Sequence, residues 1–337
     1  MTAQSFAFRW PHAHAFIWRG LALLRVMGIG VIAGFVAGLV AGGVGSRLAM
    51  KIVALVAGPD AQGQITENGS TIGVFTAETI FLFFFGAALG IVGDLFYMAL
   101  RPWLPATGRW RGLACGAALL ATGGAMIVEA GNVDFAQFGL PALNVILFAA
   151  LYLGFGLLVA PLADGLDRRV PALTADQVSH FGTGTGYGLV AIGGLPIAFV
   201  LLLAVGSANV WILLGGVLLA ICGLVALGLY FFKSNVAWRG QRLGTFAFAT
   251  ASGVFGCFML VIFTLGFIIV SDEGRGETRL AGALVLLVIV TGFGGRDWLA
   301  RAEQAAGHPR PALILAVPVL LGLSMTIREI GRILFGW

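Results

Sequence analysis

Residues 22–45 read ALLRVMGIGVIAGFVAGLVAGGVG, and Arg25 is the only charged residue among them. An α-helix needs about 20 consecutive apolar residues to cross the roughly 30 Å hydrocarbon core of a bilayer. This run is long enough, and it exceeds the apolar region of a cleavable signal peptide. The segment therefore predicts a first transmembrane helix that stays in the protein as an anchor.

The rest of the chain repeats this pattern. Of its 337 residues, 59% are hydrophobic and 10% are charged, with a mean hydropathy of +0.98, whereas a typical soluble domain has about 25% charged residues. Further apolar runs occupy residues 76–100, 112–130, 140–161, 186–206, 209–232, 244–270, 280–295 and 312–328. We predict an all-α polytopic membrane bundle of about nine spans. The short run 280–295 and the charged end of run 312–328 leave a range of eight to ten.

The basic residues orient this bundle, because Lys and Arg near span ends are retained on the cytoplasmic side. With the N-terminus inside, the connections and ends on the cytoplasmic side carry fourteen of the 20 basic residues. These residues are scattered at span ends and form no basic patch, which argues against nucleic acid as a partner and leaves the lipid bilayer. The arginine, glycine and alanine bias fits a GC-rich bacterium, so we expect a multi-pass protein of the bacterial inner membrane.

The longest polar inner connection divides the predicted spans into two halves. Residues 1–161 would form a cytoplasmic segment and a four-span half, 162–183 a cytoplasmic linker, and 184–337 a second half of four or five spans. The similar triplets at 110–112 and 238–240 favour parallel repeats. On the outer side, Asn68-Gly69 lies between alternating residues, which predicts a small β-hairpin near 64–73.

Small residues recur every fourth position in the first span, at Gly30, Gly34, Gly38 and Gly42. Such a stripe lets another helix backbone approach closely, either within the chain, in a homo-oligomer or on a membrane-protein partner. Residues 42–46 are glycine-rich and should loosen the helix. A break is also expected at Gly193, Gly194 and Pro196 in the fifth span, and Pro318 should interrupt the ninth.

Charged residues near the predicted outer ends of the spans suggest a site. Arg47 and Lys51 lie four apart on one helix face, and Glu78, Glu129 and the nearby Asp134 fall at a similar depth. These side chains could form a charged cluster that binds an anionic substrate or lipid. The alternative is that the two cations extend to headgroup phosphates and the acids are solvated.

Asp94 is the acid that lies deepest within a predicted span, about 10 Å before Arg101 along the helix. An intramembrane acid needs a partner or a wet cavity. Two interpretations remain: a proton or cation step in transport, or a structural pair with Arg25.

No motif for catalysis or nucleotide binding occurs, and no histidine lies in a span, so we expect neither an enzyme nor a metal or cofactor site. Cys115, Cys222 and Cys257 fall in apolar runs without a pairing pattern. The leading hypothesis is permease-like transport of a small solute or ion. The alternative is a non-catalytic structural or assembly subunit that packs on a membrane partner through its glycine-rich first span. A lipid-modifying enzyme is the least favoured class.

Overall fold

The computed structural model describes residues 11–66, 71–74, 77–104, 108–132, 134–170, 276–295 and 310–336, with five isolated positions between 249 and 260. The chain separates into two compact units. One comprises Met1–Val31 and Gly165–Ile262, and the other comprises Ile32–Asp164 and Phe263–Trp337. The second unit holds most of the described helices, and the glycine stripe and Asp94 fall largely within it.

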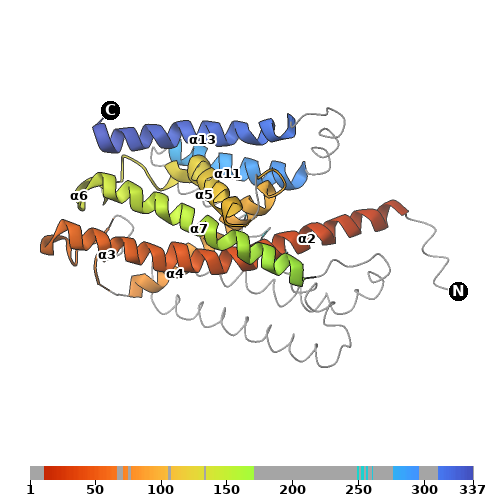
Figure 1. The fold of residues 1–337 in the computed structure, drawn as a ribbon, viewed down its shortest axis with the longest axis horizontal. Coiled ribbons are helices and arrows are strands. Elements are labelled where there is room, and N and C mark those ends of the chain that lie inside the picture. The colour runs from red at the N-terminus through yellow and green to blue at the C-terminus, as the bar shows by residue number, and fades with distance from the viewer. Residues whose placement is uncertain are drawn as a thin grey trace, which may run out of the picture. The chain divides into compact units, whose positions relative to one another are not determined.

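The first span is part of a much longer helix than the hydropathy predicts. Helix α2 (Pro11–Gly38) is followed directly by a π-helical segment η1 (Leu39–Val44) and by α3 (Gly45–Ala57), with no loop between them (Figure 1). In η1 the amide of Gly45 donates to the carbonyl of Val40, five residues back. The predicted loosening near residue 42 therefore takes the form of a widened turn, and the helix does not end there.

The other described helices overlap the predicted runs, and α4 matches its run most closely. Helix α4 spans Ala77–Leu100, α5 spans Arg109–Gly123, and α7 spans Pro141–Arg169. Shorter elements connect them: the 3-10 turns η2 (Pro59–Ala61) and η3 (Gly124–Met126), and the single-turn helix α6 (Asp134–Gln137). Near the C-terminus come α11 (Gly276–Gly294) and α13 (Arg310–Phe335). The described part of the chain is thus helical and contains no strand.

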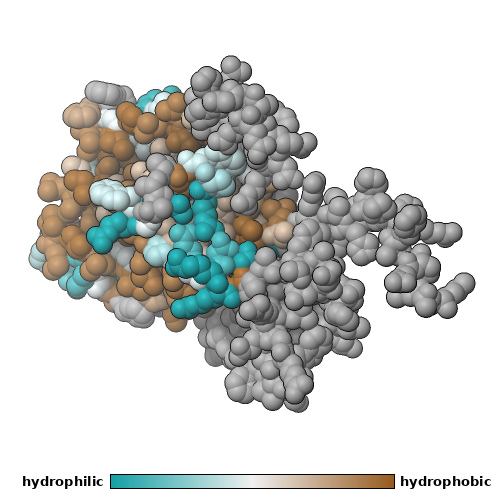
Figure 2. Space-filling model, turned by 45° about the vertical axis from the view of Figure 1, so that its right-hand side comes forward, coloured by the Kyte–Doolittle hydropathy of each residue, from teal (hydrophilic) through white to brown (hydrophobic). Residues whose placement is uncertain are grey.

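Four helical segments are long and apolar enough to cross a membrane, judged by length and composition. They are Ala22–Ala57, Leu82–Leu100, Pro141–Arg169 and Ile314–Phe335, and Arg279–Gly294 is a shorter apolar helix. Large apolar side chains remain exposed on these helices, among them Leu48, Leu55, Val290 and Leu320. In Figure 2 hydrophobic residues cover much of the described surface in view, and hydrophilic residues gather in one patch. This surface is compatible with a helical membrane protein.

Three local predictions need correction. Run 112–130 is not one helix, because α5 ends at Gly123 and a 3-10 turn follows. Helix α13 continues through Pro318, which therefore does not interrupt it. The β-hairpin near 64–73 is not confirmed: the described residues there form a single antiparallel bridge, between Ile65 and Thr71, with no strand.

Two further predictions concern segments that lie wholly or partly outside the described residues. The expected break at Gly193, Gly194 and Pro196 lies outside the described residues. The division at a linker of residues 162–183 stays a prediction, although α7 remains helical up to Arg169 and so includes the first part of that segment.

Close backbone contact holds the second unit together. A Cβ atom placed on Gly38 would lie 2.6 Å from the Cα atom of Gly90 in α4, and one on Gly42 would lie 2.9 Å from the Cα atom of Gly86. Real Cβ atoms essentially never approach so closely, so α4 can take this position against α2 and η1 only because glycine lacks a side chain. Gly30 is buried in the first unit.

The connections predicted on the outer side pack together into a small apolar cap. Phe138, just after α6, is buried with Ala61 and Ile72 from the connection between α3 and α4. The amide of Gln137 also donates to the side-chain oxygen of Gln64 at 3.5 Å. The ends of α3, α4 and α7 that adjoin these connections therefore lie on one side of the second unit.

Candidate functional site

Asp94 is completely buried in the second unit, six residues before the end of α4. Neither of its carboxylate oxygens has a hydrogen-bond partner among the described residues. Buried polar groups are nearly always hydrogen-bonded, and an unpaired buried charge costs several kcal/mol or more. Asp94 is therefore the described acid whose surroundings least explain its presence.

Tight packing against α2 surrounds Asp94. A Cβ atom on Gly34 of α2 would lie 2.8 Å from the Cβ atom of Asp94, so the acid occupies space that only a glycine leaves open. The backbone of Gly34 approaches the carboxyl without reaching hydrogen-bond geometry. Cys115 of α5 is also completely buried. Among the described residues, no group of three or more His, Cys, Asp or Glu side chains surrounds Asp94 in the way that a metal site requires.

One face of α4 leads from this acid to the end of the helix. Residues three, four and seven positions apart share a helix face, which places Gly90, Asp94, Tyr97 and Arg101 in one row. Tyr97 is fully buried, and its hydroxyl donates to a carboxylate oxygen of Asp164 in α7 at 3.2 Å. The row thus joins a buried acid to a polar cluster near the helix end.

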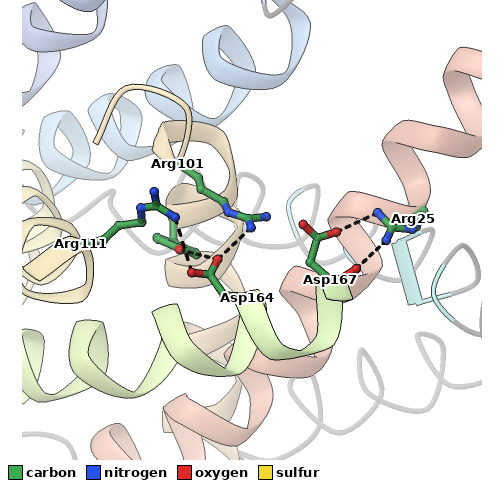
Figure 3. Close-up of polar contacts among 6 residues, drawn as sticks. Arg25, Arg101, Arg111, Asp164 and Asp167 are labelled. Carbon is green, nitrogen blue, oxygen red and sulfur yellow. Dashed lines mark hydrogen bonds and ion pairs between the residues drawn. The ribbon is translucent and has the colours of Figure 1, made fainter. Parts of the chain in front are cut away.

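Asp164 is the centre of that cluster. Arg101 at the end of α4 lies 2.8 Å from one carboxylate oxygen, and Arg111 at the start of α5 lies 3.5 Å from the other. Figure 3 shows the two guanidinium groups approaching the carboxylate from different helices. All three side chains are about one quarter exposed or less. The cluster places the end of α4, the start of α5 and the C-terminal part of α7 next to one another.

The suggested pair of Asp94 with Arg25 is wrong. Arg25 lies in the first unit, where its guanidinium binds the carboxylate of Asp167 at 2.9 Å and the carbonyl of the same residue at 3.0 Å. It also donates to the carbonyl of Val170 at the end of α7. These acceptors sit where α7 leaves free carbonyls, and a cation there is favoured by the helix dipole as well. The sequence pattern put Arg25 and Asp94 at a similar predicted membrane depth, but Arg25 pairs with Asp167.

Arg47 has a different setting from the one expected for an outer charged site. Its guanidinium donates to the hydroxyl of Thr79 and to the carbonyls of Thr71, at 3.0 Å, and Val74, at 3.4 Å. These contacts attach the connection between α3 and α4 to both helices. Through these three contacts Arg47 braces the connection between α3 and α4.

The other predicted members of the outer cluster are dispersed or only partly described. Lys51 is exposed on α3, one turn after Arg47, and Glu129 is half-buried in the segment after η3. Glu78 lies in the first turn of α4, and its side chain is outside the description. Asp134 begins α6, where its amide binds the side chain of Asn132. The common outer site therefore stays a prediction.

Sequence reasoning missed a second buried acid, Glu329 in α13, which is 2% exposed. One carboxylate oxygen accepts the amide of Ala130 at 2.9 Å, and the other pairs with Arg332 at 2.7 Å. One turn earlier, the hydroxyl of Thr326 accepts the amide of Ala125 at 3.2 Å, where α5 has become a 3-10 turn. Both residues therefore satisfy backbone groups that the irregular end of α5 leaves free.

The predicted ninth run, 312–328, stops one residue before Glu329, whereas α13 extends to Phe335. The acid was therefore left outside the predicted spans. Among the described residues no three His, Cys, Asp or Glu side chains converge in a way that could hold a metal ion. Neither a family model, nor a curated protein sequence, nor a solved structure matches the chain.

Proposed function

We propose that this chain is a multi-pass α-helical protein of the bacterial inner membrane, with about nine spans and a cytoplasmic N-terminus. Its permease-like activity would move a small solute or ion, and Asp94 would bind and release the coupling proton. The four long apolar helices and the exposed apolar side chains support the membrane setting. The buried, hydrogen-bond-deficient carboxyl of Asp94 is the single observation that carries the functional part.

The chemistry of the surroundings favours a proton over a metal cation. A carboxylate held in an apolar site is stabilised when it binds a cation, and a proton needs no further ligands. Sodium or calcium would need several oxygen ligands, and the groups near Asp94 are a glycine backbone, a thiol and apolar side chains such as Phe155, which packs on the adjacent Gly93. The polar cluster around Asp164 lies toward the arginine-rich end and provides an exchange route to water.

The proposal is tested by following the carboxyl group directly. The purified protein, in detergent and in lipid vesicles, is examined by infrared spectroscopy across a pH series. A protonated-carboxyl band that disappears on raising the pH, is absent in Asp94→Asn and persists in the matched control Asp134→Asn is the expected result. If all protonated-carboxyl intensity persists unchanged in Asp94→Asn, or if sodium and not protons removes it, the proposal fails.

The assembly-subunit alternative has less support. This hypothesis was based on the glycine stripe as a surface for a partner. Gly34, Gly38 and Gly42 of that stripe lie against α4 of the same chain. A partner that used this stripe would have to displace α4 from the second unit.

A further inference from the structure

The cluster around Asp164 and the buried acid Asp94 share one cation. Arg101 forms the short contact to Asp164. It also follows Asp94 on the same face of the chain, about two helical turns further along. Arg101 therefore stands between two carboxyls, of which one is partly exposed and already paired, and the other is fully buried and lacks hydrogen bonds.

The geometry allows this sharing. Arg101 follows Asp94 by seven residues, about 10 Å along the same face of α4, so the long arginine side chain can extend back along its own helix. The other titratable and charged groups near the acid are limited. Cys115 comes from α5, Tyr97 comes from α4, and Asp164 comes from α7, whereas α2 contributes the backbone of Gly34.

We propose that Arg101 is a switching counter-ion that links the protonation of Asp94 to the state of the Asp164 cluster. This inference rests on the proposed proton binding at Asp94. When Asp94 carries its proton, Arg101 holds Asp164, as in the structure, and the ends of α4 and α7 are joined. When the proton leaves, the carboxylate of Asp94 attracts Arg101, the contact with Asp164 weakens, and this end of the second unit loosens.

Arg111 provides an internal control for this idea. It also contacts Asp164, at 3.5 Å, and has a similar partial exposure. It comes from the start of α5, so it does not share the helix face that carries Asp94. A role limited to holding Asp164 would make the two arginines equivalent, whereas a shared counter-ion would make only Arg101 sensitive to the state of Asp94.

The experiment compares Arg101→Gln and Arg111→Gln in two backgrounds, wild type and Asp94→Asn, by thermal unfolding of the full chain in detergent over a pH series. In the wild-type background the Tm loss caused by Arg101→Gln should grow as the pH rises, because a second attraction then depends on the arginine. In the Asp94→Asn background that loss should be smaller and independent of pH. The loss caused by Arg111→Gln should be the same in both backgrounds at every pH.

The variant Arg101→Lys provides two additional comparisons. Arg101→Lys keeps the charge and should restore the pH-dependent part of the stability, which a purely steric role of Arg101 would not allow. If Arg101→Gln yields no folded protein, the comparison of Arg101→Lys with wild type in both backgrounds replaces it, and a pH dependence that ignores the Asp94→Asn change overturns the inference. Equal behaviour of Arg101 and Arg111 also overturns it.

The two proposals fail separately. If the infrared band shows that Asp94 binds a proton while Arg101→Gln is insensitive to the Asp94 background, the proposed function stands and the switching role is wrong. If the infrared band shows no titration of Asp94, the proposed function itself is wrong.

Discussion

Two buried acids of the second unit, Asp94 in α4 and Glu329 in α13, differ in what surrounds them. Glu329 accepts a backbone amide and pairs with Arg332, so both of its oxygens are occupied. Asp94 is equally buried, yet neither oxygen has a hydrogen-bond partner within the described part of the chain. Buried acids that complete a structure are satisfied by it, so the contacts of Glu329 indicate a structural role, and the contrast supports the proposed proton binding at Asp94.

The largest expected effect comes from adding a side chain where α4 and α2 are in close backbone contact, one turn before Asp94. Gly90→Leu should destabilise the protein by about 3 kcal/mol or more, because the new side chain would overlap the backbone of α2 near Gly34 and Gly38. The matched control is Gly154→Leu in α7, whose Cβ position has no atom within 4 Å and which should be close to neutral. Unfolding in detergent, followed by circular dichroism, measures both. Equal losses for the two variants would show that α4 does not pack on α2 in this way.

A smaller effect is expected at the satisfied acid. Glu329→Ala should cost about 2 kcal/mol of unfolding free energy, since the amide of Ala130 loses its acceptor and Arg332 loses its ion pair. Glu329→Gln keeps an acceptor and should lose less than half as much. The same unfolding assay measures both variants, and a neutral Glu329→Ala would remove the structural role from Glu329.

The smallest effect, and one of opposite sign, is expected at the unsatisfied acid. Asp94→Asn should leave the stability unchanged or raise it by up to about 1 kcal/mol at alkaline pH, because no hydrogen bond is lost and a buried charge is avoided. Unfolding of the variant and the wild type at neutral and alkaline pH measures this difference. A loss as large as that of Glu329→Ala would mean that Asp94 has a structural partner, and the comparison between the two acids would no longer hold.

The sequence predicted features that depend on one segment better than features that depend on contacts between distant segments. Run 76–100 nearly coincides with α4, Ala77–Leu100, because hydropathy and helix length are properties of one segment. The depth of Asp94 within that span was evident for the same reason. The partner of Arg25 could not be predicted in the same way, because it is Asp167 near the end of α7, 142 residues further along the chain.

Backbone irregularities were the second limit. The sequence indicated a weak point in the first span, but the π-helical form and its start at Leu39 depend on packing against α4. In α13, Pro318 was taken as an interruption although a helix tolerates proline in a membrane when neighbours satisfy the freed backbone groups. Asp164 was assigned to a linker, because nothing in its own neighbourhood reveals that two arginines from α4 and α5 meet there.

The widened turn η1 has a geometric consequence for the far end of its helix. A π-helical turn accommodates one residue more than an α-helical turn, and each residue of an α-helix advances about 100° around the axis. Every side chain of α3 is therefore displaced by about that angle from the direction that an unbroken α-helix would give it. Arg47 follows η1 by three residues and reaches Thr79 and the carbonyl of Thr71 from this displaced direction. The one extra residue in η1 thus determines the direction in which Arg47 points when it holds the connection between α3 and α4.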